Sequence, residues 1–86
     1  MSDYNGWKNR QTWNVSLWIN NDENLYSSAV RFMNDRKNQE KPMRNSYRMF
    51  ICSNGMRYER TPDRIGWLTT RLDYRALDSM MAELVA

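Results

Sequence analysis

The sequence contains no histidine and a single cysteine, Cys52, among its 86 residues. Without histidine there is no Ser-His-Asp triad and no Cys-His zinc cluster, and one cysteine cannot form a disulfide within the chain. The remaining acidic groupings, Asp22 with Glu23 and Asp73 with Asp78, fall where helix caps and solvated helix faces are expected. We therefore expect a protein that is not an enzyme, with no catalytic residue, no cofactor and no metal site.

Long hydrophobic runs are also absent, because the longest uninterrupted apolar stretch is the four residues Met49-Phe50-Ile51-Cys52. A signal peptide or a membrane span would need a much longer stretch. The sequence therefore predicts a cytoplasmic protein without a membrane partner. A chain of 86 residues has room for one small core, and a hydrophobic fraction of 41% is typical of globular domains. We expect residues 1–86 to form a single domain.

Positive charge is concentrated in the middle of the chain. Lysine and arginine number 13 against 10 aspartates and glutamates, which gives a net charge of +3. Residues 31–64 carry nine basic and four acidic side chains, whereas residues 1–30 and 65–86 each carry two basic and three acidic ones. The middle segment is therefore the part most attractive to a polyanion.

Two helices are indicated by apolar residues that recur at three- and four-residue spacing. The first follows the cluster Asn20-Asn21-Asp22, and the second follows Asp73, so that each has a side chain able to cap its first turn. The apolar stripes are Leu25, Tyr26, Ala29, Val30, Phe32 and Met33 in the first, and Ala76, Leu77, Met80, Met81, Leu84 and Val85 in the second.

The stretch from Trp13 to Ile19 fits either a strand or a helix, because its apolar residues alternate and also share one broad helical side. We favour the helix, since a strand would leave Trp18 alone on the polar face. A short asparagine-rich corner would then join it to the next helix. We expect these two helices to form an antiparallel pair that packs against the C-terminal helix.

Residues 46–60 leave two structures open. Tyr47, Phe50 and Ile51 share a helical face and Gly55 could end such a helix, whereas Ser53-Asn54-Gly55 could be the turn of a hairpin. Thr61-Pro62 is typical of a helix start followed by a short turn. The favoured fold is all-α, a single domain of four or five short helices. The alternative is an α+β fold with a hairpin at about 46–60.

The N-terminal part of the chain is rich in tryptophan and asparagine. It contains Tyr4-Asn5-Gly6-Trp7, Thr12-Trp13-Asn14-Val15, Leu17-Trp18-Ile19 and Asn21-Asp22. This pattern resembles a small family of uncharacterised proteins from bacteriophages, cyanobacteria and archaea. The later Thr61-Pro62-Asp63 and the stretch 72–78 resemble that family's C-terminal part. The resemblance implies a small, mostly helical domain in a phage setting and no assigned activity. Arg64 departs from it, because the family pattern has glycine after Thr-Pro-Asp.

The tryptophans allow two interpretations. Each can bury the large area that a small domain needs, whereas an exposed cluster of Trp7, Trp13 and Trp18 would be a hot-spot patch for a protein partner. Asn14 and Asn20 beside them are read as caps or corner residues. Cys52 is expected to be a small buried hydrophobe.

Arginines and aromatic residues alternate in the basic middle segment. Such a mixture is typical of single-strand and RNA grooves, in which cations contact phosphates and rings stack on bases. The same residues would also suit an acidic protein partner, or would simply be a core aromatic and a solvated face. The candidate residues here are Arg44, Tyr47, Arg48, Arg57, Tyr58 and Arg60.

These observations give three functional hypotheses. The first is a non-enzymatic phage-type accessory protein that binds and modulates a host protein or nucleoprotein through an aromatic and arginine surface. The second is direct nucleic-acid binding through residues 31–64. The third is a homo-oligomeric structural protein in which the apolar end Leu84-Val85-Ala86 packs across a twofold axis.

Overall fold

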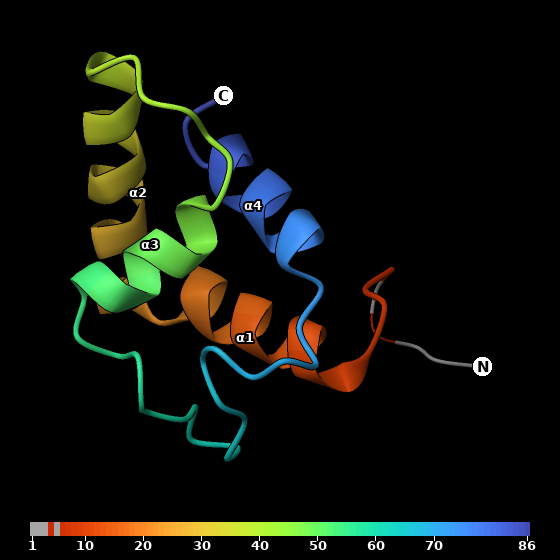
Figure 1. The fold of residues 1–86 in the computed structure, drawn as a ribbon. Coiled ribbons are helices and arrows are strands. Elements are labelled where there is room, and N and C mark those ends of the chain that lie inside the picture. Colours follow the sequence, from red (N-terminus) through yellow and green to blue (C-terminus); the bar gives the residue numbers. More distant parts are fainter. Residues whose placement is uncertain (1–3, 5) are drawn as a thin grey trace.

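The computed structural model describes Tyr4 and residues 6–86 and confirms an all-α fold for them (Figure 1). The described chain contains four helices: α1 Arg10–Asn21, α2 Glu23–Asn38, α3 Ser46–Ser53 and α4 Tyr74–Glu83. Extended pairing in this part of the chain is limited to an isolated bridge between Arg60 and Gly66. Asn5 of the N-terminal motif lies outside the described residues. None of the helices in this region is long and apolar enough to cross a bilayer.

Three of the helices begin at a side chain that caps their first turn. Asn9 Oδ1 accepts a hydrogen bond from the backbone N–H of Thr12 at the start of α1. Asp22 does the same at the start of α2, and Asp73 at the start of α4. The predicted caps at Asp22 and Asp73 are confirmed, and each satisfies an amide that the helix itself leaves unpaired.

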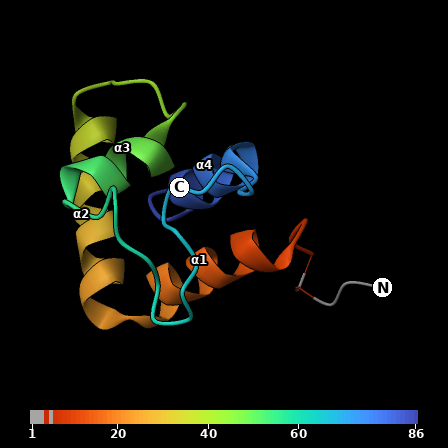
Figure 2. The ribbon, with the colours of Figure 1, turned by 60° about the horizontal axis from the view of Figure 1, so that its bottom comes forward.

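Helices α1 and α2 meet at a sharp corner, so the predicted antiparallel pair is wrong (Figures 1 and 2). A single residue, Asp22, joins them. Its N–H donates to the carbonyl of Trp18 in α1, while its side chain caps α2. One residue cannot reverse the direction of the chain, and α2 therefore leads away from α1. Helix α4 packs against both of them, as well as against α3.

The core draws on all four helices and on the segment between α3 and α4. Helix α3 points Tyr47, Phe50 and Ile51 inward, which is the face that their spacing predicts. The buried hydrophobic residues are Val15, Ile19, Ala29, Met33, Tyr47, Phe50, Ile51, Met56, Ile65, Trp67, Leu72, Leu77 and Met81. They form one contiguous cluster.

Residues 46–53 are helical and not one arm of a hairpin, and Gly55 lies past the end of the helix with a φ of +72°. That backbone conformation is open to glycine and costly for other residues. Thr61-Pro62 does not start a helix, so that prediction is wrong and the pair instead opens a tight turn. Cys52 is exposed and not buried, because Phe50 and Ile51 take the inward face of α3.

The C-terminal residues pack against their own chain. Leu84 and Val85 are half-buried against the core, and Lys37 Nζ donates to the carbonyl of Val85 at 2.8 Å. The apolar end of the chain thus has a role within the monomer. Self-association through it stays a prediction.

Candidate functional site

The segment from Glu59 to Trp67 lies outside the helices and forms a narrow turn. The N–H of Thr61 donates to the carbonyl of Ile65 at 2.8 Å, and that of Trp67 donates to the carbonyl of Glu59 at 3.2 Å. The hydroxyl of Thr61 also accepts the N–H groups of Asp63 and Ile65, each at 3.2 Å. A hairpin-like turn therefore exists, but it lies at 61–65 and not around Ser53-Asn54-Gly55.

Helix α1 holds this turn through a buried asparagine. Asn14 is 2% exposed; its Oδ1 accepts from the hydroxyl of Thr61 at 2.8 Å, and its Nδ2 donates to Asp63 Oδ2 at 2.8 Å. Trp18 Nε1 donates to the same carboxylate oxygen at 2.9 Å. The sequence suggested that Asn14 is a cap or a corner residue, and this is wrong. Asn14 instead links two segments that are 47 residues apart in the chain.

These two hydrogen bonds, from Asn14 first and Trp18 second, lower the pKa of Asp63 below its ordinary value. The nearby positive charge of Arg10 acts in the same direction, and partial loss of hydration opposes all three. A donated hydrogen bond favours the ionised form of a carboxyl group, because only that form accepts with its full negative charge. The ionised carboxylate of Asp63 thus binds the turn to α1.

A second contact from α1 fixes the chain just before α4. Asn9 Nδ2 donates to the carbonyl of Arg71 at 2.7 Å, and the N–H of Asp73 donates to the hydroxyl of Thr12 at 2.9 Å. The Thr12 side chain is fully buried. The two ends of the irregular segment 61–73 are therefore both held against the same helix.

Three arginines from residues 60–71 line one concave surface. Arg60, Arg64 and Arg71 surround a pocket of about 310 Å³. Its other lining residues are Gln11, Ile65, Gly66 and Thr69. No described carboxylate lines this pocket. Such a site offers several N–H donors and concentrated positive charge to an anion.

An exposed tyrosine lies on the same loop. Tyr58 is 88% exposed, and the guanidinium carbon of Arg57 lies 5.3 Å from the centre of its ring. Arg57, Tyr58 and Arg60, all predicted as partner-binding residues, are thus neighbours in a segment without regular structure. Both the ring and the cations are available to a ligand.

The other predicted residues of the basic segment lie elsewhere. Arg48 stacks on Tyr74, with its guanidinium carbon 4.2 Å from the ring centre. Arg44 and Arg75 line another pocket beside Tyr74, with a volume of about 500 Å³. Residues 31–64 therefore do not present one continuous basic face.

Tyr47 is not a binding residue, which corrects the sequence-based prediction. Its side chain is fully buried, and its hydroxyl donates to the carbonyl of Trp67 at 2.6 Å. Burial, followed by the neighbouring Tyr74, raises the pKa of Tyr47 far above its ordinary value. The ring is part of the core because α3 directs position 47 inward.

The tryptophans do not form the exposed patch that a protein hot spot would need. Trp7, Trp13 and Trp18 are half-buried, and Trp7 and Trp18 pack against the core. The Trp13 ring centre lies 6.0 Å from that of Tyr4. Trp18 also donates a hydrogen bond to Asp63. The observed contacts of these tryptophans are therefore with other parts of the fold.

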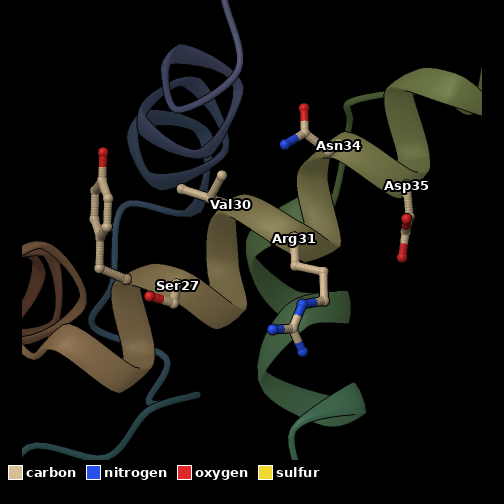
Figure 3. A pocket seen from close by; sticks show the side chains of 6 residues that line it. Ser27, Val30, Arg31, Asn34 and Asp35 are labelled. Atoms are coloured by element: carbon tan, nitrogen blue, oxygen red, sulfur yellow. The ribbon is translucent and has the colours of Figure 1, made fainter.

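A further hollow lies on the outer face of α2 (Figure 3). Its volume is about 390 Å³, and all six of its lining residues, Tyr26, Ser27, Val30, Arg31, Asn34 and Asp35, belong to that one helix. Figure 3 shows Val30 and Asn34 on one side of the helix and Arg31 and Asp35 on the other. Because a single element makes this surface, no group is held against another across it. Within the described residues there is also no set of three side chains that could hold a metal ion.

A model of one protein family matches residues 1–86. The chain belongs to this family of unknown function, DUF7249. Neither the curated proteins nor the solved structures contain a significant match to it. An origin in phages, cyanobacteria or archaea stays a prediction.

The structure brings together residues from the N-terminal and the C-terminal parts of the sequence pattern. Thr12, Asn14 and Trp18 of the N-terminal pattern bind the backbone or side chains of Thr61, Asp63 and Asp73 in the C-terminal one. The two halves of the pattern thus form one hydrogen-bonded scaffold. This scaffold holds the turn at 61–65 in place, and the arginine pocket lies beside that turn.

Sequence reasoning missed Arg64, Arg71 and Gln11 as site residues. Arg71 lies outside the basic segment 31–64, and Gln11 carries no charge, so neither composition nor charge distribution pointed to them. The one local signal was Thr61-Pro62-Asp63, because a tight turn there brings Arg60 and Arg64 close together.

Proposed function

We propose that this protein is a non-enzymatic, cytoplasmic module that binds single-stranded nucleic acid. The contact surface is the loop from Arg57 to Arg71. The observation that carries the proposal is the position of Tyr58. It is almost fully exposed beside Arg57 and lies two residues before Arg60 of the arginine pocket. A phage accessory protein that acts on a host nucleoprotein would have use for such a surface.

The ring of Tyr58 is open to a ligand from solution. Stacking of a nucleobase on an aromatic side chain contributes about 1–3 kcal/mol and does not depend on which base is present. Unpaired bases offer their faces, whereas duplex bases offer only their edges. Tyr58 therefore favours a single strand over a duplex.

The charges around the loop favour the same ligand. Residues 57–71 contain four arginines and two carboxylates, and one of those carboxylates, Asp63, is engaged by Asn14 and Trp18. Asp63 keeps its negative charge, and four arginines against two carboxylates leave the loop with a net charge of +2. Cations beside an aromatic ring are what a single-strand groove uses to hold phosphates while a base stacks.

The proposal is tested by the anisotropy of labelled single-stranded DNA, RNA and duplex DNA at low and physiological salt. We expect salt-sensitive binding that is tightest for the single strands, and Tyr58→Ala should weaken it by about fivefold or more. The matched control is Tyr26→Ala, which removes another exposed tyrosine, 42% exposed on α2. Absence of binding at low salt, or equal effects of the two substitutions, would contradict the proposal.

A protein partner is the second candidate, and the pocket beside Tyr74 favours it. This pocket combines Met43 and Tyr74 with Arg44 and Arg75, a mixture of apolar and arginine groups that is common at protein interfaces. Capture of a host protein by the wild-type chain, lost with Arg75→Ala and kept with Tyr58→Ala, would support this candidate.

A further inference from the structure

We propose that the pocket between Arg60, Arg64 and Arg71 is a phosphate-binding site. The inference deepens the proposed function, and rests on it insofar as the phosphate belongs to a nucleic acid. It differs from that function in the group recognised: Tyr58 would contact a base, whereas this pocket would hold the phosphoryl group itself.

The lining of the pocket matches the chemistry of a phosphate. Three guanidinium groups surround it, and Gln11 and Thr69 add polar side chains. Arginine presents a planar fork of N–H groups that pairs with two phosphate oxygens at once. No described carboxylate is among the residues that line the pocket. The volume of about 310 Å³ admits a phosphoryl group together with part of the sugar attached to it.

The pocket is also held in place before any ligand arrives. Arg60 pairs with Gly66 across the turn, the turn itself is bound to Asn14 and Trp18 of α1, and the carbonyl of Arg71 is bound to Asn9. The backbone of each arginine is therefore tied directly or through one neighbour to the same rigid helix. Fixing the backbone in advance lowers the entropy lost on binding.

The backbone at Arg64 is an independent observation that points the same way. Its φ is +69°, in the left-handed region that glycine adopts freely and that a side chain with a Cβ makes costly. The arginine at this position therefore carries a backbone cost that a glycine would avoid. Strain of this kind gathers at ligand-binding positions, where the side chain is needed. Arg64 lines the pocket, which gives its side chain a use there.

The first experiment is isothermal titration calorimetry with pyrophosphate as the probe. We expect binding to the wild-type chain, and at least a tenfold loss with Arg64→Gly and with Arg71→Ala. Arg64→Gly removes the side chain while relieving the backbone, so loss of folding would not explain the result. The matched control is Arg31→Ala, which removes the same charge from the exposed surface of α2 and should change the affinity by less than twofold.

Two results of this calorimetry would overturn the phosphate site. One is no heat of binding with the wild-type chain. The other is an equal loss with Arg31→Ala and Arg64→Gly, because that would show a response to net charge and not to the pocket.

A second titration separates the sources of the phosphate, using one oligonucleotide with a 5′-phosphate and the same one with a 5′-hydroxyl. A preference for the 5′-phosphate that Arg64→Gly abolishes identifies a terminal phosphate. Equal affinities that Arg64→Gly weakens alike identify an internal phosphodiester. If Tyr58→Ala weakens both oligonucleotides and Arg64→Gly weakens neither, the proposed function stands and this site does not. If pyrophosphate binds in the pocket and neither oligonucleotide binds, the site stands and the proposed function does not.

Discussion

At the scale of single residues, Arg64 combines a costly backbone conformation with a side chain that lines the pocket. The sequence resemblance predicts glycine after Thr-Pro-Asp, and that pattern stays a prediction. The backbone at Arg64 has a φ of +69°, in the region that glycine favours. Asn45, another residue with positive φ, is of a type that tolerates this region because of its short polar side chain. Arginine has no such advantage. Arginine at position 64 therefore lowers the stability of the fold but places a cation at the pocket.

Arg64→Gly should increase the free energy of unfolding by about 0.5–1 kcal/mol. Relief of the left-handed strain contributes about 1–2 kcal/mol, and the greater freedom of glycine in the unfolded chain offsets about 0.5–1 kcal/mol of it. Urea denaturation followed by tryptophan fluorescence measures the difference.

The control for this substitution is Arg31→Gly in the interior of α2, where glycine should cost about 1 kcal/mol. The two variants thus lose the same side chain and are expected to shift stability in opposite directions. A loss of stability with Arg64→Gly as well would show that the Arg64 side chain contributes more to folding than its backbone conformation costs.

At the scale of secondary-structure elements, α3 depends on α4 for its start. Asp78 of α4 accepts the N–H of Asn45 at Oδ2 and that of Tyr47 at Oδ1, both at 3.0 Å. Asn45 precedes the helix but makes no side-chain cap of its own. A helix of eight residues is not stable alone in water. The carboxylate supplied from another helix therefore takes the place of a local cap, and its charge suits the positive end of α3.

Asp78→Ala should lower the free energy of unfolding by about 1–2 kcal/mol, which is the usual effect of removing an N-cap. Native-state hydrogen exchange should show the loss first in the amides of α3. Glu83→Ala, which removes an exposed carboxylate from the same helix, should change stability by less than about 0.5 kcal/mol. Unchanged protection of α3 in the Asp78 variant would mean that burial of Phe50 and Ile51 alone holds the helix.

The elements that the sequence predicts well are those whose signals are local. The helix after Asp22, the helix after Asp73 and the caps themselves are all predicted from residues within one or two helical turns, and the structure confirms them. The apolar stripe after Asp22 is confirmed only in part, because Ala29 and Met33 are buried whereas Tyr26 is 42% exposed. The choice of a helix for the stretch from Trp13 to Ile19 is also confirmed. Val15 and Ile19 of this helix are buried in the core, whereas Leu17 is exposed.

The elements that the sequence does not predict depend on partners far along the chain. Nothing near Asn14 reveals that it will bind Thr61 and Asp63, and Asp78 looks like a solvated residue until α3 is placed above it. For the same reason, only some residues of the candidate site could be predicted from the sequence. Arg57, Tyr58 and Arg60 lie within four residues of one another in the sequence. Arg71 lines the pocket from farther along the chain, and Asn9 binds its carbonyl.

At the scale of the whole molecule, α1 is the element to which the rest of the site is attached. It begins the chain's regular structure, forms the corner with α2, and binds the turn at 61–65 and the residues before α4. In Figure 2 the irregular segment between α3 and α4 runs past α1. The shape of the arginine pocket and the stability of the fold therefore depend on the same small set of hydrogen bonds.

Because Asp63 is one of these partners, stability should depend on pH in a defined way. Its pKa in the folded state lies below the ordinary value, owing to the hydrogen bonds from Asn14 and Trp18 and then to Arg10. The unfolded chain therefore takes up the proton first as the pH falls below about 5, one unit above the ordinary pKa of about 4. The contribution of Asp63 is fully present above that pH and is lost as the pH falls through the folded pKa.

Asp63→Asn should lower stability at pH 7 and reduce the further loss between pH 7 and pH 3. The amide oxygen can still accept from Asn14 and Trp18, but without the charge that makes these bonds strong, and it does not titrate. Urea denaturation at a series of pH values gives both curves. Glu59→Gln, an exposed carboxylate of the same loop, should leave the shape of the wild-type curve unchanged. Parallel curves for Asp63→Asn and the wild type would show that other carboxylates govern the acid response and that the anchor between α1 and the turn holds without the charge of Asp63.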